Sequence, residues 1–370
     1  MKSALLILSL FVFVGCTIDN ENPPSGSGIV QPPAGNGLPD IQTEPGQRRY
    51  LTEQYNIDNR INIDIYYPSD YDSNFDYPIL YFNDGDSFAS TFLKLTQNTA
   101  QLQEPFIMVG LYAGGNRLNW YTPYNDPWIQ QNWGNYLPQS EQYTQLLINN
   151  VMPFVEGRFS VDAERRAIFG ISLGGLHATW AAINYPEVFS FSAGLSPSYW
   201  VDDYAVLFED LSKVQTDNSF YFDMGTKEWN YYIPLINNLK IQGLTFAEQI
   251  FYYEILDGTH STFSWDKRID IPFRLFMNGG PNSEISKFQI INECIPSQST
   301  AGRIFQRLNP LVTYENGIKL SMTTEAEYAV IEGLGEVTPD GRYLVEGEGP
   351  MKVMVSYQEW SEEVTLFNCQ

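Results

Sequence analysis

The chain has 370 residues, and its formal net charge is −23 because 44 acidic residues outnumber 21 Lys and Arg. Such an excess of negative charge repels nucleic acid and anionic membrane surfaces, which excludes both as partners. With 43% hydrophobic residues the chain can bury one large core and a small second one, and it suits a neutral substrate.

The first residues, 1–16, have a positive start and a short apolar run, which is typical of a signal peptide. The end of this run, Phe13-Val-Gly-Cys16, resembles a bacterial lipobox, which implies cleavage before Cys16 and a lipid on its thiol. The alternative is an ordinary secretory signal. We therefore expect a lipid-anchored protein of the bacterial cell envelope, periplasmic or surface-exposed, that reaches the membrane only through this anchor. Residues 17–46 are rich in Pro, Gly, Asn and Ser and predict a flexible tether.

Apolar strand patterns then alternate with helical patterns. The strands are expected at residues 62–67, 78–83, 105–111, 167–169, 189–195, 219–224 and 249–256, and the helices at 140–157, after 172, at 233–242 and at 261–277. This order predicts an α/β fold, a doubly wound and mostly parallel sheet, over residues 47–281.

From residue 282 to residue 370 the pattern becomes short alternating segments separated by turn signals, which predicts a small all-β sandwich. The segment 337–349 weakly resembles bacterial immunoglobulin-like domains. Cys294 and Cys369 bracket this module, and in an oxidising compartment they are expected to form a disulfide. Since all catalytic candidates precede residue 282, the sequence also predicts that the domain over residues 47–281 stays active without the module.

The sequence Gly170-Ile-Ser172-Leu-Gly174 follows an apolar strand and opens a helix. This is the layout of a nucleophile elbow, in which a strained turn exposes a serine hydroxyl. The backbone N–H of Leu173 is expected to donate to an oxyanion, and the loop after the strand 78–83, Asp84-Gly85-Asp86, offers backbone N–H groups for a second donor.

A serine nucleophile needs a base, and the chain has only two histidines. His177 lies in the helix after the elbow and is expected to be structural or to flank the pocket. His260 follows the last strand of the sheet, and is the predicted base. For the acid we expect Glu228, with Asp223 as the alternative, in or after the preceding strand.

Further motifs make the family resemblance specific. They are Tyr81-Phe-Asn-Asp-Gly85, Asn116-Arg-Leu-Asn-Trp-Tyr-Thr-Pro123, Gly170-Ile-Ser-Leu-Gly-Gly175, Pro186-Glu-Val-Phe189, Ser196-Pro-Ser-Tyr-Trp200, Gly225-Thr-Lys-Glu228 and Gly258-Thr-His260. Over residues 48–278 the chain resembles the putative-esterase family of α/β-hydrolases, which includes feruloyl, acetylxylan and siderophore esterases. The resemblance implies Ser172 as nucleophile, His260 as base and Glu228 as acid, with oxyanion donors at Leu173 and Asp86.

Aromatic side chains surround the predicted site. Those expected to bind substrate are Trp120, Tyr121, Tyr199, Trp200 and Trp229. The sequence shows no metal-ligand cluster and no cofactor motif. The predicted function is a serine esterase that cleaves acyl or feruloyl esters on polysaccharides. The alternatives are a siderophore trilactone esterase and a non-catalytic surface carbohydrate-binding lipoprotein; the oligomeric state stays open.

Overall fold

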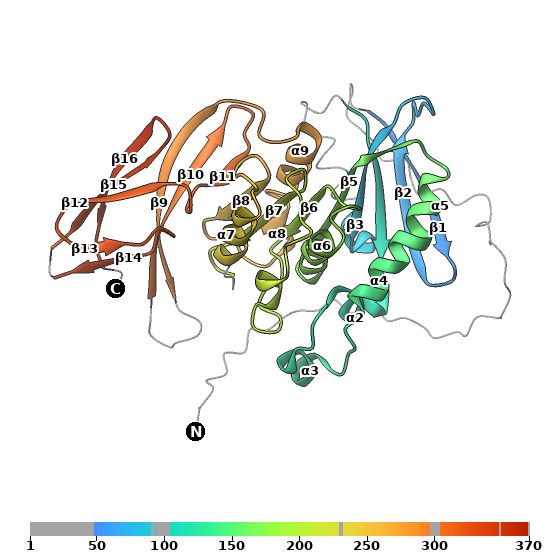
Figure 1. Ribbon diagram of the computed structural model, residues 1–370, viewed down its shortest axis with the longest axis horizontal. Helices are drawn as coiled ribbons and strands as arrows, with labels where there is room; N and C mark the ends of the chain where they lie inside the picture. The colour runs from blue at the N-terminus through green and yellow to red at the C-terminus, as the bar shows by residue number, and fades with distance from the viewer. Residues whose placement is uncertain are drawn as a thin grey trace. The chain divides into compact units, whose positions relative to one another are not determined.

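The computed structural model describes residues 48–89, 93, 104–228, 232–296, 304–347 and 349–368, without the side chains of 294–296 and 304–305 (Figure 1). All of these belong to one compact unit. The predicted signal peptide, the tether, the lipid site Cys16, the substrate contact Trp229 and the disulfide between Cys294 and Cys369 depend on residues or side chains outside this set. They stay predictions.

An eight-stranded mixed sheet forms the centre of the larger part. In spatial order its strands are β1 (Tyr50–Ile57), β2 (Ile61–Pro68), β4 (Ile107–Tyr112), β3 (Tyr77–Asn83), β5 (Val161–Ile171), β6 (Phe191–Leu195), β7 (Ser219–Gly225) and β8 (Ile250–Ile255). The pairs from β4 through β8 are parallel, whereas β1 pairs with β2 and β2 with β4 in the antiparallel sense.

The central strands are apolar on both faces because both faces are covered. All seven residues of β3 and all five of β6 are buried. Strands buried on two sides are typical of parallel sheets packed between helices. The predicted doubly wound α/β fold is confirmed.

Helices lie between most of these strands. They are η1 (Gly114–Asn116), α2 (Arg117–Tyr121), α3 (Pro127–Trp133), α4 (Ser140–Leu146), the π-helical turn η2 (Leu147–Val151), α5 (Met152–Glu156), α6 (Leu173–Asn184), η3 (Ala205–Phe208), α7 (Ile233–Ile241), α8 (Thr262–Trp265) and α9 (Asp270–Asn278). None of the described helices is both long and apolar enough to cross a membrane.

Two of the expected helices differ in detail from the structure. The helix expected over 140–157 passes through the π-helical turn η2 just before Pro153, which has no N–H for a helical hydrogen bond. The helix expected over 261–277 is two helices, α8 and α9, and the residues between them include Arg268.

The C-terminal part is entirely β, as expected. Its strands are β9 (Ile285–Pro296), β10 (Ile304–Tyr314), β11 (Lys319–Ser321), β12 (Glu327–Glu332), β13 (Leu334–Val337), β14 (Tyr343–Glu346), β15 (Met351–Tyr357) and β16 (Trp360–Leu366). They form antiparallel sheets in the orders β11-β10-β9, β12-β15-β16 and β13-β14. A small core of its own includes Leu308, Val353 and Leu366. The immunoglobulin-like identity of this module stays a prediction.

The main core extends past the expected boundary at residue 281. Val312, Leu320 and Met322 of the C-terminal part belong to the same apolar cluster as the large sheet. The backbone N–H of Glu254 in β8 also donates to Ser321 Oγ at 2.9 Å. Cutting the chain near residue 282 would expose this shared surface. Contrary to the sequence-based expectation, we expect the truncated protein to be destabilised.

Candidate active site

Ser172 stands at the sharp turn between β5 and α6. Its φ of 59° and ψ of −122° lie in a region that residues with a Cβ rarely adopt, which stores strain at this turn. The turn also needs glycine, because a Cβ on Gly170 would lie 2.1 Å from the carbonyl oxygen of Gly174. The predicted elbow is therefore the conformation that the structure shows.

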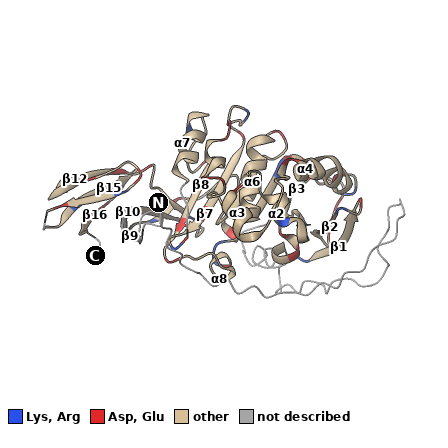
Figure 2. Cartoon of the chain, turned by 90° about the horizontal axis from the view of Figure 1, so that it is seen from below, with Lys and Arg blue, Asp and Glu red and all other residues tan. Residues whose placement is uncertain are grey.

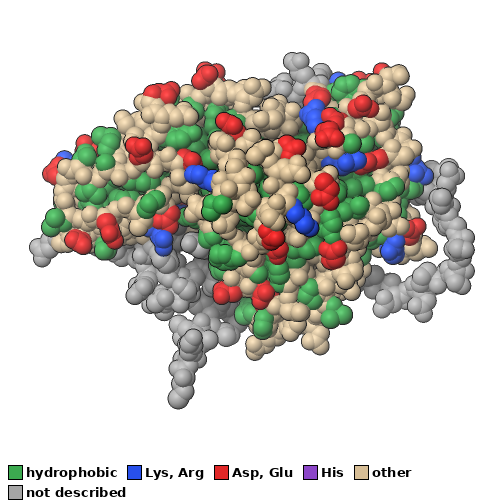
Figure 3. Space-filling model, in the orientation of Figure 1, with side chains coloured by type: hydrophobic (Ala, Val, Ile, Leu, Met, Phe, Trp, Pro, Cys, Tyr) green, Lys and Arg blue, Asp and Glu red, His purple; other side chains and the backbone are tan. Residues whose placement is uncertain are grey.

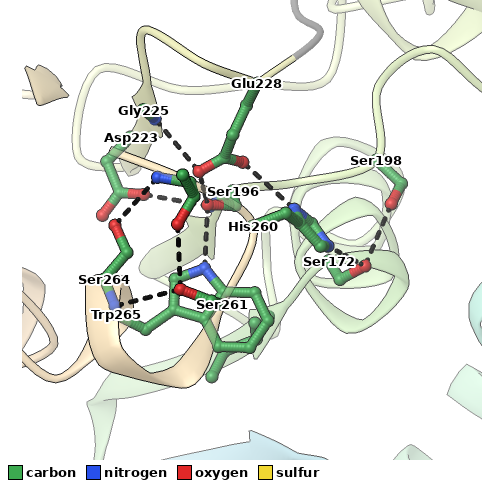
Figure 4. Close-up of polar contacts among 12 residues, drawn as sticks. Ser172, Ser196, Ser198, Asp223, Gly225, Glu228, His260, Ser261, Ser264 and Trp265 are labelled. Carbon is green, nitrogen blue, oxygen red and sulfur yellow. Dashed lines mark hydrogen bonds and ion pairs between the residues drawn. The ribbon is translucent and has the colours of Figure 1, made fainter. Parts of the chain in front are cut away.

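A chain of hydrogen bonds joins Ser172 to a histidine and a glutamate (Figure 4). His260 Nε2 lies 2.9 Å from Ser172 Oγ, and His260 Nδ1 lies 3.1 Å from Glu228 Oε2. Because Nδ1 faces a carboxylate, it carries the proton of the neutral ring, and Nε2 is left to accept the serine proton. The structure thus brings together the three residues that the sequence singled out.

Glu228 is nearly buried, yet its charge is well supported. The carboxylate accepts hydrogen bonds from Ser196 Oγ at 2.8 Å and from Gly225 N–H at 3.1 Å. Burial alone would raise the pKa of Glu228, but the bond to His260, the bond from Ser196 and the charge of Arg268 hold it below its ordinary value. An ionised Glu228 can fix the tautomer of His260 and stabilise its protonated form.

Asp223, the alternative acid, lies in a different position. It accepts Ser196 N–H at 2.9 Å and the Tyr221 hydroxyl at 2.8 Å, and it pairs with Arg268 Nε at 2.9 Å. Burial raises the pKa of Asp223, and Arg268 opposes that rise. Of the two carboxylates it is Glu228, not Asp223, that contacts the histidine.

Ser196, Trp265 and Arg268 are partners that the sequence analysis did not assign. Ser196 Oγ donates to Glu228 and accepts from Trp265 Nε1 at 2.9 Å and from Arg268 at 2.6 Å. Trp265 also packs edge-on against the His260 ring, with centroids 5.1 Å apart. The motif Ser196-Pro-Ser was a signal for the first of these, whereas nothing local marks Arg268.

Ser198 is a second neighbour of the reacting hydroxyl. Its Oγ lies 3.2 Å from Ser172 Oγ, and its backbone N–H donates to the carbonyl of Ser172 at 3.0 Å. This contact ties the loop after β6 to the elbow, so that the loop lies at the mouth of the site (Figure 4).

The loop expected to carry an oxyanion donor is held firmly. The Asp84 carboxylate pairs with Arg117 at 2.8 Å, and Asp84 N–H donates to the Tyr121 hydroxyl at 2.8 Å. Arg117 also reaches the carbonyl of Ile171, next to the elbow, at 3.3 Å. Gly85 lies so close to β4 that a Cβ there would be 2.3 Å from the backbone of Gly110. Leu173 opens α6, where unpaired N–H groups and the helix dipole favour negative charge.

His177 belongs to the core. It is wholly buried, and burial lowers its pKa to about 3, so the ring is neutral. Nδ1 accepts from Asn83 at 3.1 Å, and Nε2 lies 3.0 Å from Thr144 Oγ1. The Thr144 hydroxyl itself donates to Ser140, so Nε2 carries the proton. The structural role expected for His177 fits this setting.

A comparison with known proteins places the chain in a family. The family model described as "Putative esterase" matches residues 55–270, which is more than half of the chain. The chain belongs to the putative esterase family. This membership supports a carboxylic ester hydrolase.

Individual relatives of this chain match shorter stretches. The chain is 28% identical over 133 residues to the uncharacterized protein YbbA of Bacillus subtilis, covering 35% of this chain and 53% of the relative. It is 30% identical over 120 residues to a siderophore triacetylfusarinine C esterase of Aspergillus fumigatus, covering 30% of this chain and 41% of the relative. The chain thus matches about half the length of these curated relatives.

A solved structure supports the fold of the large part of the chain. The BES protein from Bacillus cereus superposes with a TM-score of 0.51 at 18% identity, covering 65% of this chain and 99% of the other. Because 65% of this chain already covers nearly all of that protein, the share left unmatched is large enough to hold the C-terminal strands.

The aromatic residues expected to bind substrate separate into two groups in the structure. Tyr121 and Tyr199 are wholly buried, so the expectation that they contact substrate is not met. Tyr121 holds the Asp84 loop, and the Tyr199 hydroxyl bonds Thr179 at 2.7 Å. Trp120 is partly exposed and stacks on Tyr143, and Trp200 is partly exposed as well.

No group of acidic, cysteine and histidine side chains among the described residues is arranged to hold a metal ion.

Proposed function

We propose that this protein is a serine esterase that hydrolyses carboxylic esters through an acyl-enzyme. The hydrogen-bonded chain from Ser172 through His260 to Glu228, set on a strained elbow, carries the proposal. Family membership supports the same chemistry.

In the first half-reaction Ser172 Oγ attacks the ester carbonyl, and its proton passes to His260 Nε2. The negative charge on the carbonyl oxygen is stabilised by the N–H groups of Leu173 and Asp86. His260 then gives the proton to the leaving alcohol as the C–O bond breaks. In the second half-reaction His260 takes a proton from water, the hydroxide attacks the acyl-enzyme, and Ser172 regains its proton as the acid leaves.

A direct test uses the protein without residues 1–16. A fluorophosphonate should label Ser172 alone, as read by peptide mass spectrometry, and p-nitrophenyl acetate should be turned over. Stoichiometric labelling of another residue, or no turnover by a folded protein, would contradict the proposal. The second outcome would favour the non-catalytic carbohydrate-binding alternative, against which the complete hydrogen-bond chain argues.

For the substrate we propose acyl or feruloyl esters on polysaccharides. A net charge of −23 suits a neutral substrate, and acidic side chains are spread over the visible face rather than gathered at one place (Figure 3). A second candidate is a siderophore ester, which the similarity to the fungal siderophore esterase favours. Rates on acetylated xylan, methyl ferulate and a catechol trilactone would separate the two.

We also propose that the protein is anchored in the cell envelope by a lipid on Cys16. Labelling of the full-length protein with a fatty acid analogue in a bacterial host, lost in Cys16→Ser, would test this. Secretion of unlabelled full-length protein would instead favour an ordinary signal peptide.

A further inference from the structure

Three tryptophans form one cluster at the surface. Trp128 and Trp133 come from α3, and Trp200 comes from the loop after β6. The ring centroids lie 5.5 Å apart for Trp128 and Trp133, 5.6 Å for Trp128 and Trp200, and 5.8 Å for Trp133 and Trp200. Trp128 and Trp133 are 53% and 49% exposed, and among the described tryptophans these two alone count as exposed. Large aromatic surface that stays in water marks a binding site.

The loop that carries Trp200 contacts the reacting serine. Ser198, whose Oγ is 3.2 Å from Ser172 Oγ, stands two residues before Trp200. The Asp126 carboxylate, just before α3, accepts Asp202 N–H at 2.7 Å, which fastens α3 to the loop that carries Trp200. Figures 1 and 2 both show α3 beside α2, whose residues hold the Asp84 loop of the site.

The cluster is also rigid before any ligand binds. The Asp126 carboxylate caps α3 by accepting Ile129 N–H at 2.9 Å, and Ile129 is wholly buried. On the other side, the loop turns through Asp202, Asp203 and Tyr204, with φ values of 51°, 52° and 67°. Backbone strain of this kind persists where the surroundings fix it, and it is common at functional sites. Because these side chains are already ordered, ligand binding costs little conformational entropy.

The charges around the cluster select a neutral ligand. Residues 118–157 and 167–212, which supply all three tryptophans, contain no Lys or Arg, whereas Asp202 and Asp203 are exposed. An anionic ligand would meet repulsion here with no cation from these segments to offset it. Helix α3 carries no charged residue (Figure 2), and its amide residues Gln131 and Asn132 are exposed.

We propose that Trp128, Trp133 and Trp200 bind a neutral sugar ring of the ester substrate. The C–H faces of a pyranose pack on indole rings, and its hydroxyls pair with amide groups of the kind found on α3. This inference rests on the proposed esterase function and deepens it by giving the polysaccharide a place beside the reacting serine.

The test separates binding from turnover. In Ser172→Ala protein, binding of neutral xylo-, cello- and manno-oligosaccharides is measured by titration calorimetry. At least one series should bind, and Trp128→Ala or Trp133→Ala in that background should weaken its Kd by roughly 3- to 10-fold. Trp133→Phe should weaken the Kd less than Trp133→Ala, because phenylalanine keeps an aromatic ring at this position.

The matched control is Phe367→Ala, which removes another exposed aromatic ring from the C-terminal part and should leave Kd unchanged. Thermal unfolding of each variant shows that it is folded. No binding by any of the three series, or equal Kd values with and without Trp128 and Trp133, would overturn the inference. So would tryptophan-dependent binding of a catechol trilactone in place of the sugars. Labelling of Ser172 by the fluorophosphonate is independent of all these outcomes, so the inference can fail while the esterase proposal stands.

Discussion

Two buried clusters of the molecule have the same charges, two carboxylates and one arginine, and they behave differently. The first, Asp223, Glu228 and Arg268, lies at the active site. The second, Glu254, Glu293 and Arg307, joins β8 of the large sheet to β9 and β10 of the C-terminal part.

The difference lies in how one buried glutamate of each cluster is held: neutral donors surround Glu228, whereas Glu254 has the Tyr232 hydroxyl at 3.4 Å and Glu293 has the Asn309 side chain. At the active site Ser196, Gly225, Tyr221 and His260 all donate to the carboxylates, and Glu228 keeps a lowered pKa. In the second cluster Arg307 makes a close contact with Glu254 and reaches Glu293 only at 3.5 Å. Burial raises the pKa of Glu293 to about 7. Glu228 and Glu293 thus differ in the direction of their pKa shifts, although their clusters have the same charge composition.

The largest effect should come from the histidine that the first cluster orients. His260→Ala should lower kcat by about 10⁴-fold, since members of such a triad act as a unit. The control is His177→Gln, which alters a neutral core histidine and should cost stability rather than turnover in the folded protein. Rates on p-nitrophenyl acetate decide between them. Greater loss of activity in folded His177→Gln would reverse our assignment of the two rings.

The second-largest effect should come from a Glu→Gln substitution in the first cluster, and the same substitution in the second cluster is its control. Glu228→Gln removes the charge that orients His260, and we expect kcat to fall by about 10²- to 10⁴-fold. Glu293→Gln makes the identical chemical change far from the histidine, and kcat should stay within about twofold of the parent protein. Steady-state rates of both purified variants test the comparison. Similar losses in the two would mean that the second cluster also supports catalysis.

The residues that the sequence singled out and the structure brings together lie in local motifs. The elbow around Ser172 and the strand-end positions of Glu228 and His260 depend on a few neighbouring residues and on the order of strands. Tyr121 and Tyr199 were misassigned because their burial depends on packing between distant segments. Arg268 was missed for the same reason, since its partner Asp223 lies 45 residues earlier on another element.

The domain boundary, too, could be predicted from the sequence only in part. A change in pattern near residue 282 marks where α/β alternation ends, and the all-β character that follows was predicted. The shared core, in which Leu320 and Met322 pack with the large sheet, depends on contacts that no local pattern contains.

A smaller effect is expected from the hydroxyl that links the first cluster. Ser196→Ala leaves buried N–H groups of Trp265 and Arg268 without this acceptor and takes a donor from Glu228. Losses of this kind cost about 1–3 kcal/mol of stability, and we expect kcat to fall about tenfold. KM for a small ester should change little, because Ser196 acts through Glu228. A stability loss with an unaltered kcat would show that Ser196 supports the fold alone.

The smallest effect concerns the proton on Glu293. Its folded-state pKa of about 7 lies above the ordinary value of 4.5, so the folded protein binds this proton more tightly than the unfolded chain. Below about pH 4.5 the carboxyl is protonated in both states and costs nothing; as pH rises toward 7 the unfolded chain gains free energy by releasing the proton, and stability falls. Glu293→Gln mimics the protonated form, and so should escape this loss. We would measure the free energy of unfolding of both proteins in urea at pH 5 and pH 8. Relative to the parent, the variant should become more stable by on the order of 1–3 kcal/mol at the higher pH. A difference that stays constant between the two pH values would mean that Arg307 keeps Glu293 ionised, and that the two clusters are more alike than their donors suggest.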